Sequence, residues 1–125
     1  MKYITNIVGA LLGLLFLFTG TDYFFHYGPK MPPPEPGTPP ALFMGALIPI
    51  GYFAMIKVLE ITGAVLTAIP KTRNFGLLIL GPIIVNILAF HIFLAKSIGP
   101  MQVFVAVAGA FLLWSARGKF AGLAN

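Results

Sequence analysis

The fold class of this chain is decided by residues 42–69, which read LFMGALIPIGYFAMIKVLEITGAVLTAI. The run is apolar almost throughout, and its only charged residues are Lys57 and Glu60, near its middle. An apolar run of this length predicts a helix that crosses a membrane. A charge at the bilayer centre costs about 2.5–3.5 kcal/mol on insertion scales, so such residues usually face a bundle interior. We therefore expect Lys57 and Glu60 to form an ion pair or a polar site inside the protein.

The composition of the whole chain supports an integral membrane protein. Of its 125 residues, 58% are hydrophobic and 9% are charged, which is too apolar for the surface of a water-soluble domain. The apolar runs are continuous rather than alternating, and four strands could not close a barrel. The sequence therefore predicts an all-α, integral membrane four-helix bundle as one domain over residues 1–125. Its four helices are expected at about residues 3–25, 41–69, 75–94 and 101–116.

The distribution of basic residues predicts the orientation. Five of them (Lys2, Lys71, Arg73, Arg117 and Lys119) fall on one side of the four-span arrangement, against Lys30 and Lys96 on the other. By the positive-inside rule both termini and the turn at 70–74 are cytoplasmic, and Trp114 marks that interface. The proline-rich loop 26–40 is then external, and its composition favours a stiff extended connection. Because the basic residues are scattered among the spans, we expect no nucleic-acid binding.

Two further patterns concern how the helices pack. Pro49 lies inside the second span, where we expect a kink that lets the beginning of this long span lie at the interface. Small residues recur at four-residue spacing, at Gly9 and Gly13 in the first helix and at Ala106 and Ala110 in the fourth. Such spacing predicts close helix contacts, which we assign to packing within the bundle, with dimerisation as the alternative.

The chain contains few residues that could carry chemistry. It has no cysteine, which excludes a dithiol, a disulfide relay and an iron–sulfur cluster held by this chain alone. It also lacks a phosphate loop, a zinc-protease motif and a nucleophile elbow. Any redox role would therefore need an outside cofactor.

The candidate site consists of intramembrane polar residues. Glu60, Gly63 and Thr67 follow the spacing of one helix face, and Lys57 joins that face one turn outward. Asn86 in the third span is at a similar depth, where its side chain could hydrogen-bond this face across the bundle. His91 is five residues further outward and about 140° around the same helix. We take Lys57, Glu60, Asn86 and His91 as the candidate cofactor-binding residues.

Asp22, His26 and His91 are expected at one depth near the outer interface. They are acceptable metal ligands, but one carboxylate and two histidines on two helices are not a specific set, so no metal is predicted. Bis-histidine haem ligation would require His26, in or near the outer loop, to meet His91, and we do not expect it. We interpret Asp22 and His26 as interfacial anchors.

The Lys57/Glu60 pair has two interpretations that the sequence leaves open. In the first, it is a buried ion pair that fixes helix packing. In the second, Glu60 accepts a proton, or Lys57 and His91 hydrogen-bond the carbonyl oxygens of a lipid-soluble molecule such as a quinone.

At these residues the chain resembles the DoxX-like family of small four-helix membrane proteins. The resemblance extends over nearly the whole chain and is carried by four segments: GLLFLFTG (residues 13–20), FMGAL (43–47), KVLEITG (57–63) and GPIIVNILAFHIFL (81–94). It implies a multi-pass protein of the bacterial inner membrane. It also implies association with membrane oxidoreductases, which in related proteins include thiosulfate:quinone oxidoreductase subunits. On this resemblance the chain would be at most a non-catalytic or quinone-interacting subunit of an oxidoreductase.

We therefore expect a small inner-membrane subunit associated with a membrane redox complex, which holds a quinone-like molecule at the polar site. The first alternative is a structural accessory subunit of a larger membrane assembly, with no chemistry of its own. A proton or small-solute carrier is the third. The expected partners are the lipid bilayer and a larger membrane protein complex, and a homo-oligomer is left open.

Overall fold

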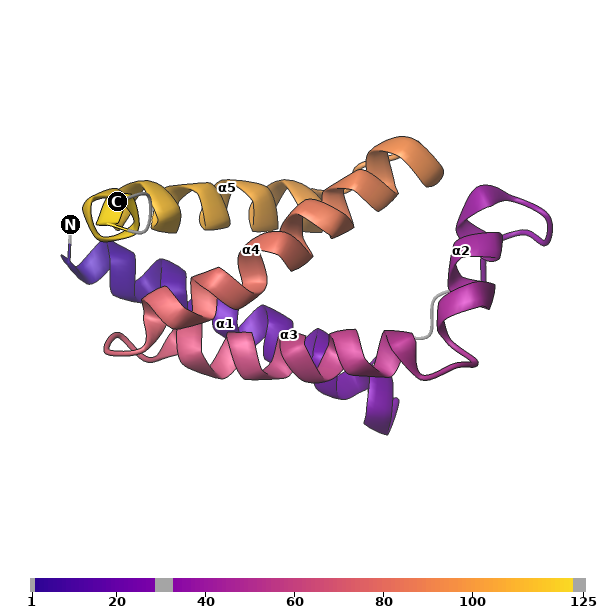
Figure 1. Cartoon of the computed structure of the whole chain (residues 1–125), viewed down its shortest axis with the longest axis horizontal. Helices are drawn as coiled ribbons and strands as arrows, with labels where there is room; N and C mark the ends of the chain where they lie inside the picture. The colour runs from indigo at the N-terminus through magenta and orange to yellow at the C-terminus, as the bar shows by residue number, and fades with distance from the viewer. Residues whose placement is uncertain (1, 29–32, 123–125) are drawn as a thin grey trace.

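The computed structural model describes residues 2–28 and 33–122. Within these ranges every regular element is helical, as the sequence predicts. The elements are α1 (Lys2–Phe25), α2 (Pro39–Leu47), α3 (Tyr52–Ala68), α4 (Arg73–Ala89), the π-helix η1 (Phe90–Leu94), α5 (Pro100–Ser115) and α6 (Arg117–Ala121). Figure 1 shows α1, α3, α4 and α5 side by side along the long axis, with α2 standing across one end. The part of the expected external loop at 29–32, including Lys30, lies outside the described residues.

Proline residues set several of the helix boundaries. Pro39 and Pro100 occupy the first positions of α2 and α5, where the missing N–H would have no helical partner. At the start of α5 the Gln102 Oε1 accepts a hydrogen bond of 2.8 Å from the Gly99 N–H. Pro70 lies in the turn between α3 and α4, as expected from its position after the second apolar run.

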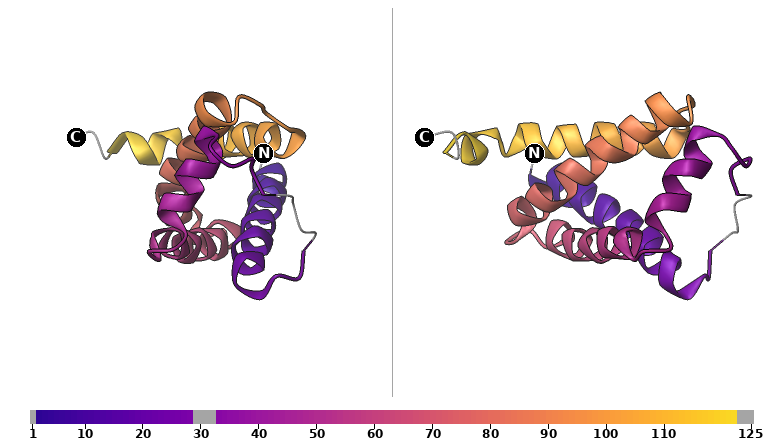
Figure 2. Two further views of the ribbon diagram at one scale, coloured as in Figure 1. Left: turned by 90° about the vertical axis from the view of Figure 1, so that its right-hand side faces the viewer. Right: turned by 45° about the vertical axis from the view of Figure 1, so that its right-hand side comes forward.

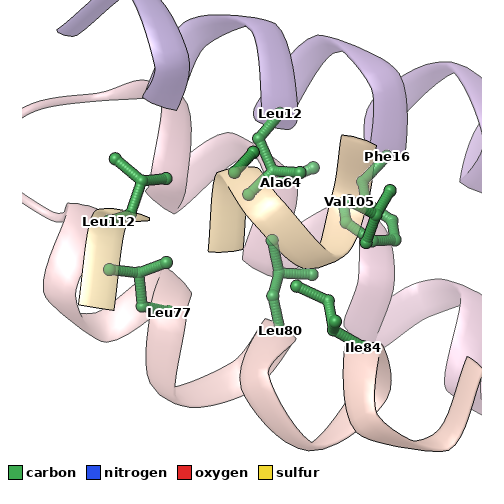
Figure 3. Packing of buried hydrophobic residues seen from close by; sticks show 9 residues of the cluster. Leu12, Phe16, Ala64, Leu77, Leu80, Ile84, Val105 and Leu112 are labelled. Atoms are coloured by element: carbon green, nitrogen blue, oxygen red, sulfur yellow. The ribbon is translucent and has the colours of Figure 1, made fainter. Parts of the chain in front are cut away.

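The core lies where α1, α3, α4 and α5 meet. Its buried apolar side chains come from all four helices (Figure 3), and they are Leu12, Phe16, Ala64, Leu77, Leu80, Ile84, Val105, Ala108 and Leu112. Three polar or charged residues, Glu60, Thr67 and Arg73, are buried together with these apolar side chains. This shared core is the frame that positions the candidate site.

Close helix contacts in this core depend on glycine. As predicted, Gly9 and Gly13 are buried, and a Cβ built on Gly13 would lie 2.7 Å from the Ala64 carbonyl oxygen of α3. The prediction for α5 was wrong, because its buried face contains Ala108 and Gly109 rather than Ala106 and Ala110. The four-residue spacing is common by chance, and the bulkier neighbours Val105 and Leu112 decide which face is buried.

The second apolar run is not one helix. It is broken at residues 48–51, and α2 and α3 meet at 85°. Pro49 contributes no backbone N–H, and Gly51 adopts a φ of 78°, a conformation that favours glycine. The expected continuous helix over 41–69 with a kink at Pro49 is therefore corrected to two helices joined by a tight turn.

Two of the helical segments are long and apolar enough to cross a membrane, namely α1 and the continuous segment Arg73–Leu94 formed by α4 and η1. The bent pair of α2 and α3 would make a third if it forms one span, and α5 is shorter, with 16 residues. The described residues thus support a membrane protein with two or three candidate spans, whereas four spans remain a prediction.

Candidate functional site

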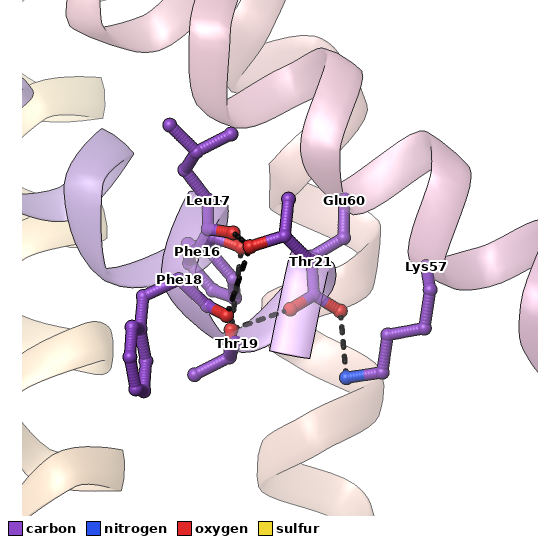
Figure 4. Close-up of polar contacts among 7 residues, drawn as sticks. All are labelled: Phe16, Leu17, Phe18, Thr19, Thr21, Lys57 and Glu60. Atoms are coloured by element: carbon purple, nitrogen blue, oxygen red, sulfur yellow. Dashed lines mark hydrogen bonds and ion pairs between the residues drawn. The ribbon is translucent and has the colours of Figure 1, made fainter. Parts of the chain in front are cut away.

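Lys57 and Glu60 form an ion pair in the middle of α3 (Figure 4). Lys57 Nζ lies 3.2 Å from Glu60 Oε2, and the Thr19 hydroxyl of α1 donates a hydrogen bond of 2.9 Å to Glu60 Oε1. Glu60 is buried, with 2% of its surface exposed. Both oxygens of this carboxylate are therefore engaged by partners inside the protein, which offsets much of the cost of burying it.

The helical pattern of the sequence explains why Glu60 is buried. The buried residues of α3 are Glu60, Gly63, Ala64 and Thr67, so the polar face predicted from spacing is the face that packs on α1 and α4. Thr19 was not among the predicted site residues. It follows the buried Leu12 and Phe16 at helical spacing, and that spacing was the signal that could have placed it on the buried face of α1.

The Lys57 side chain is only partly enclosed. Of its surface 17% is exposed, and its Nζ lies 5.2 Å from the centre of the Phe53 ring. The ring face stabilises the ammonium group. A lysine ammonium has three N–H donors, so a single contact to Glu60 leaves others for a ligand.

A cavity of about 300 Å³ opens beside this ion pair. All four predicted site residues (Lys57, Glu60, Asn86 and His91) line it, together with two further polar residues, Thr19 and Gln102, that were not among the predicted site residues. The rest of the lining is apolar: Leu15, Phe16, Phe43, Met44, Leu47, Phe53, Ile56, Ile83, Ile87, Phe90, Met101 and Val105. A mostly apolar pocket with a few convergent polar groups is the usual form of a small-molecule site.

Asn86 and His91 reach the same cavity although they are separated around their helix. Ile83, Ile87 and Phe90 also line the cavity and lie between them on the helical arc, so the cavity spans a broad face of α4 and η1. The Asn86 side chain forms no hydrogen bond to another described residue. The expected hydrogen bond from Asn86 to the polar face of α3 is therefore absent from the described part of the chain.

The His91 ring is oriented by the backbone of the preceding turn. Its Nδ1 lies 2.8 Å from the Ile87 carbonyl oxygen, which can only accept a hydrogen bond, so Nδ1 carries the proton. The other ring nitrogen, Nε2, is then an acceptor in the neutral ring and a donor in the charged ring. The neutral His91 ring can thus accept a hydrogen bond from a ligand hydroxyl group, and the charged ring can donate one to a ligand carbonyl group.

The short helix α2 contributes one wall of the cavity. Phe43, Met44 and Leu47 line it, and the rings of Phe43 and Phe90 are 5.3 Å apart between centres. None of the residues of α2 is buried. The short helix α2 is therefore a lightly attached cover over the site.

Asp22 and His26 do not join this cavity. Asp22 Oδ1 accepts a hydrogen bond of 2.5 Å from the Gly28 N–H, and the His26 N–H donates to the Asp22 carbonyl oxygen at 2.7 Å. These contacts close the C-terminal end of α1. Across residues 2–28 and 33–122, no three His, Asp or Glu residues form a group that could hold a metal ion.

Comparisons of the chain with models of known protein families, with curated proteins and with solved structures find no match. The resemblance to the DoxX-like family is therefore carried by the quoted segments alone. The function has to be argued from the cavity itself.

Proposed function

We propose that this chain is a small four-span protein of the bacterial inner membrane, similar to the DoxX-like family, that binds a quinone-like molecule in the cavity beside Lys57. One observation carries the proposal: donors and acceptors from α3, α4 and η1 converge on one otherwise apolar cavity. In this role the chain would be a subunit of a membrane redox complex, with both termini in the cytoplasm.

The residues present fit the chemistry of a quinone. Its ring and tail are apolar and suit walls such as Phe43 and Ile87, and its carbonyl oxygens accept hydrogen bonds. The Lys57 ammonium and the Asn86 amide can donate to such oxygens. When bound, a quinone supplies reversible two-electron, two-proton redox chemistry.

The chain's own residues would divide the tasks of binding and proton exchange. Glu60 holds the Lys57 ammonium at the cavity wall, since its carboxylate is paired with Lys57 and Thr19. His91, with Nδ1 fixed by Ile87, presents Nε2 as the group that can take or give a proton at a ligand oxygen. The cover formed by α2 limits the access of water to these groups.

A structural accessory subunit is the second candidate, and a specific observation favours it. Both oxygens of the Glu60 carboxylate have partners within the protein, Thr19 and Lys57, as expected of a buried pair that only fixes helix packing. A proton or small-solute carrier is third. Because both Glu60 oxygens are engaged, proton uptake there would have to break one of these contacts.

The test is to purify the intact protein gently from its native membrane and to identify co-extracted quinones and proteins by mass spectrometry. Wild type is compared with Lys57→Ala and His91→Ala, and with Lys71→Ala as the matched control, because Lys71 is an exposed lysine outside the cavity. Folding of each variant is checked by circular dichroism and by elution as a single species.

We expect quinone to be retained by wild type and Lys71→Ala and lost from the folded cavity variants. Stoichiometric partner proteins without bound quinone in any sample would instead identify a structural subunit. Equal quinone content in all four proteins would count against a site at Lys57 and His91.

A further inference from the structure

A second cavity lies at the end of the molecule away from α2, and the proposed function makes no use of it. Its volume is about 690 Å³, and it is bounded by the first turns of α1, the α3–α4 turn, the end of α5 and α6. Figure 1 shows the start of α1, this turn and the end of α5 at the same end of the molecule. Figure 2 shows α6 turned sideways from the end of α5.

The charges around this cavity are all of one sign. Lys2, Arg73, Arg117 and Lys119 line it. The only three acidic residues of the chain are Asp22, Glu35 and Glu60, and none of them is among the residues that line it. The ammonium groups of Lys2 and Lys119 have no ion pair or hydrogen bond with another residue in the part of the chain that the structure describes. This cavity therefore gathers positive charge that the described residues do not neutralise.

Arg73 fixes one of these charges in the wall. It is buried, with 7% of its surface exposed; its Nε donates to the Thr67 carbonyl oxygen at 2.9 Å and its Nη1 to Asn6 Oδ1 at 3.0 Å. Its Nη2 is buried without a hydrogen-bond partner among the described residues. A Cβ at Gly9 would collide with this guanidinium, so α1 is shaped to admit it. None of these contacts is to a carboxylate, and the positive charge stays uncompensated.

Arg117 and Trp114 build the opposite rim. The Arg117 guanidinium carbon lies 4.2 Å from the centre of the Trp114 ring, and its Nη1 donates to the Trp114 carbonyl oxygen at 2.8 Å. Stacking holds the guanidinium in place while leaving N–H groups for a ligand. Asn6, Asn74 and Ser115 add uncharged polar groups to the same wall.

We propose that this cavity binds the phosphate group of an anionic lipid headgroup. Guanidinium and ammonium groups bind phosphate oxygens by charge-assisted hydrogen bonds, and basic pockets between membrane helices are suited to such headgroups. The cavity lies at the ends of α1 and the Arg73–Leu94 segment, both long and apolar enough to cross a membrane. Trp114 in its wall is 53% exposed and can contact a lipid chain or glycerol group, which free phosphate does not offer. A lipid is therefore favoured over a soluble phosphate.

The chain contains a single tryptophan, and that residue lines this cavity, so its fluorescence reports binding directly. The purified protein in neutral detergent is titrated at fixed ionic strength with phosphatidylglycerol in mixed micelles. Phosphatidylcholine, which has no net charge, and inorganic phosphate are titrated in parallel. The variants are Lys2→Ala and Lys119→Ala, whose exposed side chains leave the core intact, and Lys71→Ala is the control, an exposed lysine of the α3–α4 turn outside the cavity lining.

We expect phosphatidylglycerol to give a saturable fluorescence change. The affinity of the protein for phosphatidylglycerol should fall about fivefold in Lys2→Ala and in Lys119→Ala, and about 25-fold in the variant that combines them. The affinity of Lys71→Ala should match that of wild type. An equal loss in Lys71→Ala would overturn the proposal in favour of general surface charge. The absence of a saturable change would also overturn it. An equal response to inorganic phosphate would overturn the assignment to a lipid, and an equal response to phosphatidylcholine would overturn the role of the charges.

Discussion

Glu60 contributes to the candidate site by pairing with Lys57 and Thr19 rather than by contacting a ligand. Both of its carboxylate oxygens are paired, one with Lys57 and one with Thr19, while Lys57 keeps donors that face the cavity. A buried pair of this kind usually adds little stability compared with apolar residues of the same shape. Removing one partner is costly, however, because the other charge is then left uncompensated. A neutral substitution of Glu60 therefore measures how much the ion pair contributes to the stability of the fold.

We expect Glu60→Gln to lower the free energy of unfolding by roughly 3 kcal/mol, because it strands the Lys57 ammonium among apolar walls. The glutamine carbonyl can still accept the hydrogen bond from Thr19. Unfolding by a denaturing detergent, followed by circular dichroism, measures the loss. The matched control Thr19→Val removes only the hydroxyl contact and should lower the free energy of unfolding by about 1–2 kcal/mol.

The double variant Lys57→Met/Glu60→Gln should recover most of the lost stability, because no buried charge remains. If it also retains bound quinone, the ammonium group has no part in binding. A Glu60→Gln protein as stable as wild type would show that the ion pair contributes nothing to the fold.

Among the elements, α2 determines access to the cavity. It is joined to α3 by the sharp turn at 48–51, buries no residue of its own, and contacts η1 through the rings of Phe43 and Phe90. An element with so few buried contacts opens more readily than the core helices.

Phe43→Ala should therefore increase the opening of α2. Because the chain has no native cysteine, Leu15→Cys, on the far wall of the cavity, provides a single thiol whose reaction with a maleimide reports this opening. Losing about 0.5–1.5 kcal/mol of aromatic contact should raise the labelling rate about twofold to tenfold. Leu42→Ala is the neighbouring control, since Leu42 is exposed and does not line the cavity. An equal rate in both variants would mean that Phe43 does not hold α2.

The contact between α3 and α4 gives a second prediction at this scale. A Cβ at Gly76 would collide with the Thr67 side chain and backbone and lie 2.8 Å from the Gly63 carbonyl oxygen. Gly76→Ala should force the two helices apart and lower the free energy of unfolding by about 1–3 kcal/mol. Gly81→Ala on the same helix meets nothing within 4 Å. It should be near neutral, because its gain in helix propensity is offset by the proline that follows. Thermal unfolding of the two variants makes the comparison, and equal melting temperatures would contradict it.

At the scale of the whole molecule, helical periodicity in the sequence was enough to predict where the long helices lie and which face of α3 is buried. The apolar runs located the four long helices, and the spacing of Glu60, Gly63 and Thr67 identified the buried face of α3. Lys57 and Glu60 on this face line the cavity, although the structure does not test what they bind. Periodicity cannot report a change of backbone direction, so the break at 48–51 was expected only as a kink. Nor can it pair residues from distant helices, which is why the Thr19–Glu60 contact was missed. Arg73 was counted only as a topology signal, although its guanidinium is buried against Gly9.

The arrangement of these parts in a membrane depends on the number of crossings, and that number depends on whether α5 crosses. With 16 residues α5 is about 24 Å long, shorter than a hydrocarbon core of about 30 Å. Mismatch of this size costs only fractions of a kcal/mol per Å, and α5 shares the core with α1 and α4, so we expect it to cross.

Single cysteines at Glu35, Lys71, Ser97 and Gly122 test this with a maleimide that cannot pass membranes, applied to intact cells. The positive-inside rule predicts labelling at Glu35 and Ser97, and protection at Lys71 and Gly122 until the membrane is permeabilised. Labelling at both Ser97 and Gly122 would show that α5 does not cross. The end of α5 and α6 would then lie on the opposite side of the membrane from the start of α1 and the α3–α4 turn, and the basic cavity that these segments bound could not form. Labelling at Lys71 but not at Glu35 would reverse the orientation while leaving the cavities where they are.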